Sequence, residues 1–292
     1  MSSRVWSLGI WLSAAVLSLG ATPLAKKMAL LDGGGSILIA LSTALVSAAL
    51  ILGWLVAQGQ FGKMSDLAPR HWRAVLLVGA LGSGLVPLFG ILAMTDTSAS
   101  NRALFQSAYP VATALAARLI LKERLDLTSY LWVGLVCIGL ILMNLDGKTG
   151  LSLMSGSFWL LLGTLPLIGL ADVIAKRALG HLTPETVALG RALGGLLILV
   201  VLLPWVATSI GDIQSTTWLW ILLAGSCMGV FGIALYQVFD RTQLTLAAGL
   251  IALAPLLTLG LEVSLLNLTL SLLQWSGFAL ALVAVVMLSR RA

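Results

Sequence analysis

Four ionisable residues interrupt stretches of sequence that are otherwise apolar: Arg118, Asp172, Arg191 and Glu262. A charge at the centre of a bilayer costs about 2.5–3.5 kcal/mol on insertion scales, so such residues usually face a cavity or a partner. The chemistry that this pattern predicts is ligand binding or charge pairing within a membrane. For Asp172 and Arg191, local pairing across the short connector between their spans is an equal alternative.

Arg118 and Glu262 occupy corresponding places behind two prolines. Arg118 follows Pro110 by eight residues, and Glu262 follows Pro255 by seven. One hypothesis is that the two opposite charges pair in one access state or border a substrate route. The alternative is that each lies near a helix end and reaches the interface or a local partner.

Pro110 and Pro255 are also the strongest candidates for helix kinks. A proline within a helix removes one backbone hydrogen bond and bends the helix. In a membrane, such backbone is tolerated where it is buried in protein or lines a cavity. We therefore expect two bends that open a central cavity, with a fixed bend serving only packing as the alternative.

Polar and aromatic residues in the middle of spans are the candidates for lining that cavity. Pockets for small metabolites combine apolar and aromatic walls with a few polar groups. A tryptophan in a membrane protein more often marks the interface with water, an alternative that fits Trp159 better than Trp11. The full set of substrate-binding candidates is Trp11, Gln106, Tyr109, Trp159, Asp172, Tyr236 and Gln237.

The composition identifies the class of protein that carries these residues. The chain has 292 residues, of which 59% are hydrophobic and 10% charged. Soluble domains carry about 25% charged residues, so this chain has too little polar surface to stay in solution. It is therefore an integral membrane protein, and its net charge of +6 does not indicate nucleic-acid binding, because the basic residues are scattered among short connectors.

A spanning helix needs about 20 mainly apolar residues. The apolar runs predict ten transmembrane helices, over 5–25, 34–57, 73–95, 98–121, 127–145, 156–178, 184–208, 215–239, 244–264 and 270–288. With a cytoplasmic N-terminus, the inner side carries Arg4, Lys63, Arg70, Arg73, Lys122, Arg124, Lys176, Arg177, Arg241, Arg290 and Arg291, and the outer side carries only Lys26, Lys27 and Lys148. Positive residues concentrate on the cytoplasmic side, so we expect both termini there and a multi-pass protein of the bacterial inner membrane.

Short matches between the two halves indicate an internal repeat. Ala25-Lys26-Lys27 corresponds to Ala175-Lys176-Arg177, and Phe89-Gly90-Ile91 corresponds to Phe231-Gly232-Ile233. The two prolines follow in the same order. We expect two five-helix repeats, over residues 1–147 and 148–292. Because five is odd, the second repeat has the opposite orientation, as in many secondary transporters.

Residues 88–144 carry a Tyr-Pro, then Leu-x-Glu-Arg, a short turn and a glycine-containing helix, with Pro110, Glu123 and Gly134 at the defining positions. In this pattern the chain resembles the drug/metabolite transporter superfamily, in its ten-helix, EamA-like bacterial branch. Pro255 and Gly277 extend the resemblance to the second half, where Asn267 departs from the pattern. The resemblance implies a carrier that exports amino acids or other small metabolites. For Glu123 itself we expect a structural role, as a cap of the following helix or a partner of a nearby residue.

Enzymatic motifs are missing from the sequence: there is no HExxH, no GxSxG and no nucleotide-binding glycine loop followed by Lys-Ser/Thr. We expect an all-α secondary transporter that is not an enzyme, needs no cofactor or metal, and works by alternating access as a monomer or homodimer. Its expected partners are a small-molecule substrate and the lipid bilayer, with no nucleic acid. The alternatives are an efflux carrier for drugs or metabolites such as nucleosides, and a membrane assembly subunit that transports nothing.

Overall fold

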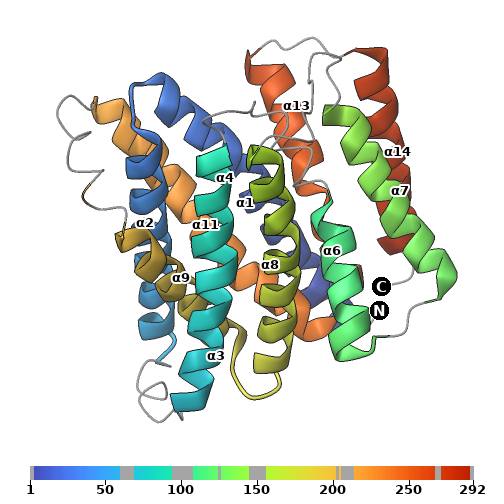
Figure 1. Ribbon diagram of the computed structural model, residues 1–292, viewed down its shortest axis with the longest axis horizontal. Helices are drawn as coiled ribbons and strands as arrows, with labels where there is room; N and C mark the ends of the chain where they lie inside the picture. Colours follow the sequence, from blue (N-terminus) through green and yellow to red (C-terminus); the bar gives the residue numbers. More distant parts are fainter. Residues whose placement is uncertain are drawn as a thin grey trace. The chain divides into compact units, whose positions relative to one another are not determined.

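The computed structural model describes residues 3–59, 69–93, 108–123, 126–144, 156–201, 204, 214–266 and 271–289, and it is helical throughout this part, with no strand (Figure 1). The chain forms two compact units. The first unit contains Met1–Leu85 and Ile174–Arg241, and the second contains Val86–Val173 and Thr242–Ala292. Each unit therefore takes segments from both halves of the sequence.

The helices of the first unit are α1 (Ser3–Leu31), α2 (Ser36–Ala57), α3 (Pro69–Gly79), the π-helical segment η2 (Ala80–Leu85), α9 (Pro184–Val200) and α11 (Ser215–Arg241). Those of the second unit are α4 (Val86–Ala93), α6 (Tyr109–Ala116), the π-helical η3 (Ala117–Leu121), α7 (Leu127–Asn144), α12 (Leu244–Ile251), α13 (Ala254–Leu266) and α14 (Leu272–Ser289). Helix α8 (Gly156–Ala178) belongs to the second unit up to Val173 and to the first unit beyond it.

Each of the ten sequence ranges expected to be helical contains helix in the described part of the chain. Among the described residues, five helices have the length and apolar composition to cross a membrane: Trp6–Leu31, Ile37–Ala57, Pro69–Phe89, Phe158–Ala178 and Ser215–Arg241. Shorter apolar helices cover Tyr109–Leu121, Leu127–Gly139, Leu244–Thr258 and Leu272–Met287.

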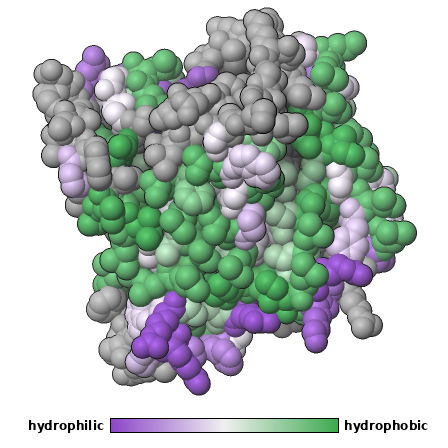
Figure 2. All heavy atoms as spheres, in the orientation of Figure 1, coloured by the Kyte–Doolittle hydropathy of each residue, from purple (hydrophilic) through white to green (hydrophobic). Residues whose placement is uncertain are grey.

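Apolar side chains cover most of the coloured surface in Figure 2, and hydrophilic residues gather at its lower edge. Large apolar side chains in the helices point outward, among them Trp6, Leu119 and Leu272, the last of which is 88% exposed. Exposed apolar surface on this scale suits contact with lipid rather than with water.

Glycines set the close packing of helices in the first unit. A Cβ atom on Gly79 of α3 would collide with the backbone oxygen of Arg191 in α9, and one on Gly194 would collide with that of Leu76. On α2, Val46 would meet a Cβ on Gly225 of α11 in the same way. Small residues allow such approach of helix backbones, so these glycines serve helix packing.

Local signals explain where two of these helices begin and end. Gly33, with φ of +88°, follows the end of α1, and the Gly34 amide donates to the Ala29 carbonyl at 3.0 Å, as in a Schellman motif. At the start of α9, the Thr183 hydroxyl accepts from the Thr186 amide at 3.4 Å, and Pro184 occupies the first turn. Proline is tolerated there because its missing N–H would have no partner within the helix.

In the second unit, α7 and α14 lie side by side (Figure 1). Gly139 of α7 faces the segment Gly277–Ala281 of α14, where an added Cβ would lie 2.6 Å from the Ala281 amide nitrogen. The sequence predicts one helix over 244–264, whereas the structure breaks it at a turn formed by Ala252 and Leu253. The break comes just before Pro255. A proline has no backbone N–H to continue the helical hydrogen bonds, and it disfavours the helical conformation of the residue before it.

Candidate functional site

Arg191 of α9 bonds to two other helical segments of the first unit. Its Nε donates to Ser83 Oγ of η2 at 2.9 Å, and its Nη1 donates to the Tyr236 hydroxyl of α11 at 3.0 Å. The guanidinium carbon also lies 5.9 Å from the centre of the Tyr236 ring, within the range of a cation–π contact. Two sequence candidates, Arg191 and Tyr236, therefore meet at one place.

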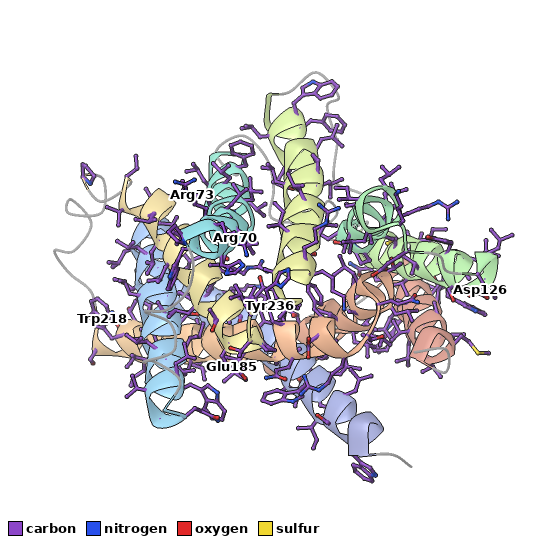
Figure 3. The ribbon with its side chains drawn as sticks, turned by 90° about the horizontal axis from the view of Figure 1, so that it is seen from below. Arg70, Arg73, Asp126, Glu185, Trp218 and Tyr236 are labelled. Carbon is purple, nitrogen blue, oxygen red and sulfur yellow. The ribbon has the colours of Figure 1, made fainter. Side chains whose placement is uncertain are left out.

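Gln237, the next residue of α11, belongs to a second polar chain in the same unit. Its Nε2 donates to Glu185 Oε1 of α9, and Arg241 donates through Nη1 to the side-chain and backbone oxygens of Gln237. Arg241 Nε donates in turn to Ser7 Oγ of α1 at 3.1 Å. Figure 3 labels Glu185 and Tyr236 beside α11. Because Glu185 is buried in the first turn of α9, its charge also interacts favourably with that helix terminus.

In the second unit, two hydrogen bonds connect α6 with α8. The Thr113 hydroxyl donates to Asp172 Oδ2 at 2.9 Å, and the Tyr109 hydroxyl donates to Thr164 Oγ1 at 3.4 Å. Asp172, Thr113 and Thr164 are buried. The candidates Tyr109 and Asp172 thus lie on one helix pair, each with a threonine partner on the other helix.

Arg118 is exposed, and its guanidinium carbon lies 5.5 Å from the centre of the Tyr130 ring. Its Nη1 donates to the Tyr130 hydroxyl at 3.4 Å. Glu262 lies in α13, but its side chain falls outside the described part, so its pairing with Arg118 stays a prediction.

The two prolines take the same place in their helices. Pro110 is the second residue of α6 and Pro255 the second residue of α13. Pro110 is buried, and the Val111 and Ala112 amides donate to the Ala108 carbonyl. Residues 94–107 lie outside the described part, so a bend ahead of Pro110 stays a prediction, whereas the turn ahead of Pro255 interrupts its helix.

The remaining candidates are scattered. Trp11 of α1 is half-buried. Trp159, near the start of α8, is 62% exposed, which agrees with the interface role given above as its alternative. Gln106 lies outside the described residues.

Glu123 connects two distant segments of the second unit. Its Oε1 accepts from the Leu244 amide at 2.8 Å, and its Oε2 accepts from the Thr245 amide at 3.2 Å and the Thr245 hydroxyl at 3.0 Å. Lys122 before it has φ of 57°, a left-handed conformation that few non-glycine residues adopt. Glu123 therefore has a structural role, but it caps α12 and not the helix that follows it in the sequence.

Sequence reasoning missed Ser83, Thr113, Thr164 and Glu185. The only available signal was spacing: Tyr109 and Thr113 stand at i and i+4 and so share a helix face. Ser83 lies between Gly82 and Gly84, a run of small residues that is more typical of helix packing than of a binding site. Within the described ranges, no three histidine, cysteine, aspartate or glutamate residues gather to hold a metal ion.

Comparison with known proteins places the chain in a family. The sequence model of the EamA-like transporter family matches it twice, over residues 6–145 and 154–290. A solved structure, described only as the crystal structure of a protein, superposes with a TM-score of 0.81 at 17% identity, covering 98% of each chain. At that identity the likeness shows the fold alone. No curated protein matches the sequence.

The two family matches together cover nearly the whole chain, and each covers one half. The family's members are membrane transporters and not enzymes, so both of these predictions are confirmed. The chain belongs to the EamA-like transporter family.

Proposed function

We propose that this protein is a secondary carrier that moves small polar or amphipathic metabolites across the bacterial inner membrane, most favourably amino acids in the direction of export. The observation that carries the proposal is the separate match of the family to each half of the chain. Two related segments within one polypeptide are the hallmark of transporters that alternate between inward- and outward-open states.

The proposed topology has ten spans in two inverted repeats of five, with both termini in the cytoplasm. The described helices supply a helical segment in each of the ten ranges. Five spans per repeat give the two halves opposite orientation, and the bias of basic residues then assigns the cytoplasmic side. The proposed substrate cavity lies near the bilayer midplane, where such repeats place it.

The polar groups within the helices support the proposal that the substrate is polar. Arg191 with its two hydroxyl partners and Asp172 with Thr113 lie in segments that are otherwise apolar. Ionisable groups in such positions are costly and therefore usually serve a function. We propose Arg191 and Asp172 as functional residues on this ground, together with Tyr109 and Tyr236.

Reconstitution of the purified protein into liposomes tests the proposal. Counterflow of labelled amino acids, nucleosides and a lipophilic drug cation is measured with and without a pH gradient. Counterflow of amino acids is the expected result. Selective counterflow of nucleosides or the drug would replace amino acids as the substrate class, and no counterflow of any solute would favour an assembly subunit.

A further inference from the structure

The last two turns of α11 are buried on every side. All seven residues from Ile233 to Phe239 are buried, although successive side chains of a helix point about 100° apart. Helices α1, α2 and α9 all pack against α11. In the proposed topology these turns lie at the cytoplasmic end of the first unit. The end of α11 therefore forms the core of the unit at that end.

A chain of hydrogen bonds connects this core to two neighbouring helices. Gln237 Nε2 donates to Glu185 Oε1 of α9 at 2.5 Å. Arg241 Nη1 donates to the side-chain oxygen of Gln237 and, at 2.7 Å, to its backbone oxygen. Arg241 Nε donates to Ser7 Oγ of α1 at 3.1 Å. These four residues, which we call the fastening chain, join α1, α11 and α9.

Gln237 is the central member of the fastening chain, and the charges on either side fix the direction of its amide. The amide oxygen faces the guanidinium of Arg241, and the amide nitrogen faces the carboxylate of Glu185. The reverse orientation would direct N–H groups at a cation and an oxygen at an anion, which have no matching acceptor or donor. The amide thus connects the two charges in one orientation only.

Opening the contact between α9 and α11 would be costly, because it would leave a buried carboxylate without its donor. Glu185 is 9% exposed and Gln237 is 7% exposed. Removal of one partner from a buried charge is strongly destabilising, whereas exposed charged pairs contribute little. Arg241 is exposed, so the link to α1 can exchange with water more easily. The contact between Glu185 and Gln237 is therefore the strongest part of the fastening chain.

Two further contacts hold the same helix end. Lys176, near the end of α8, donates through Nζ to the Phe239 carbonyl. Arg191 of α9 donates to the Tyr236 hydroxyl. Tyr236 and Gln237, consecutive residues of α11, are therefore both bonded to α9. These contacts favour the same arrangement of helix ends as the fastening chain.

We propose that the fastening chain holds the cytoplasmic ends of α1, α9 and α11 together as one block that stays closed through the whole transport cycle. Gln237 is then a structural residue and not a contact of the substrate. The movements that expose the substrate to the cytoplasm occur elsewhere in the protein. This inference rests on the proposed function, since it names the helix ends of that carrier that do not separate.

The reactivity of a buried thiol measures whether the block opens. Ala188 of α9 is 1% exposed and lies one turn after Glu185. Ala188→Cys is prepared in a variant that lacks Cys137 and Cys227, and its reaction with a maleimide is followed in the purified protein. Asp240→Cys, at an exposed position of α11, is the reactive control. We expect Ala188→Cys to react more slowly by about 100-fold or more, as for the loss of a partner of a buried charge.

Substitutions within the fastening chain test its residues. Gln237→Leu should speed the reaction of the Ala188→Cys thiol about 10- to 150-fold, as for loss of hydrogen bonds to a charged group. Gln237→Glu should also speed it, because two carboxylates would then face each other. Gln237→Glu combined with Glu185→Gln exchanges the carboxylate and the amide. The carboxylate then accepts from Arg241 and from the amide, so the slow reaction should return.

A disulfide tests whether the block stays closed during transport. A Cβ on Gly232 of α11 would lie 3.9 Å from the Ala188 Cβ, a separation that suits a disulfide. The variant with Gly232→Cys and Ala188→Cys should therefore form a disulfide on oxidation. Counterflow in liposomes should be the same before and after oxidation. Each cysteine alone, treated with the same oxidant, is the control.

The outcomes separate the block from the carrier. The block would be overturned by reaction of Ala188→Cys as fast as Asp240→Cys, by failure of the exchanged pair to restore the slow reaction, or by a reversible loss of counterflow on oxidation. A slow reaction that depends on Gln237, without counterflow of any solute, would instead overturn the carrier and leave the block standing.

Discussion

The cap that Glu123 forms on α12 predicts a specific loss of stability. Glu123→Ala removes the acceptor of the Leu244 and Thr245 amides and of the Thr245 hydroxyl. Leu244 and Thr245 are both 0% exposed, so neither amide gains full access to water when the carboxylate is removed. An unsatisfied buried donor costs about 1–3 kcal/mol, and loss of a helix cap costs about 0.5–2 kcal/mol.

These two figures describe overlapping effects, and Glu123 is itself half-exposed, so water can approach from its side. We therefore expect a loss of about 1–2 kcal/mol rather than the sum of the two figures. Thr245→Val removes only the hydroxyl and should cost about 1 kcal/mol. Because the two residues share one interaction, the double variant should lose less than the sum of the single losses.

The assay is thermal unfolding of the purified protein in detergent, followed by intrinsic tryptophan fluorescence. Asp240→Ala serves as the matched control, because Asp240 is an exposed acidic residue at the end of α11. A midpoint for Glu123→Ala no lower than that of Asp240→Ala would refute the reasoning. Strictly additive losses for Glu123→Ala and Thr245→Val would show that the two residues act separately.

Three further predictions concern packing, transport and topology. Gly79→Ala should sharply reduce the yield of folded protein, because the new Cβ would collide with the Arg191 backbone. The control Gly134→Ala, whose Cβ meets nothing within 4 Å, should be neutral or up to about 1 kcal/mol stabilising. Equal yields of the two variants would contradict the close packing of α3 on α9. Arg118→Ala and Glu262→Ala should impair counterflow per folded molecule more than Glu123→Ala, and the reverse ranking would contradict the assignment of the two charged residues to the transport route. For the topology, single cysteines are introduced at Ser2 and at Ala292 in a variant that lacks Cys137 and Cys227. Both cysteines should react with an impermeant thiol reagent only from the cytoplasmic side. Labelling of the two cysteines from opposite sides would exclude ten spans.

Much of the fold follows from the order of residue types along the chain. Apolar runs of about 20 residues require helices in a membrane, since only helices satisfy every backbone group within one segment. The ends of these helices also follow from local chemistry, as at Gly33 and Thr183–Pro184. A membrane protein with helices in all ten ranges could therefore be predicted from the sequence.

Part of the candidate site could be predicted as well. Arg191, Tyr236 and Asp172 stand out because a polar group in an apolar run is costly wherever the run folds. That reasoning selects residues one at a time and says nothing about which of them meet. It also passes over small polar residues, such as Ser83 and Thr113, that lipid tolerates at little cost.

The sequence by itself determined the helices, the membrane class and the list of costly polar residues, because each depends on composition within a few turns of one helix. Only the tertiary structure decided the partners: Arg191 meets Ser83 across 108 positions of sequence, and Glu123 caps a helix 121 positions away. These pairings depend on which helix backbones can approach closely, and that is settled by glycines and side-chain volumes on two segments at once. A local pattern contains only one side of such a contact.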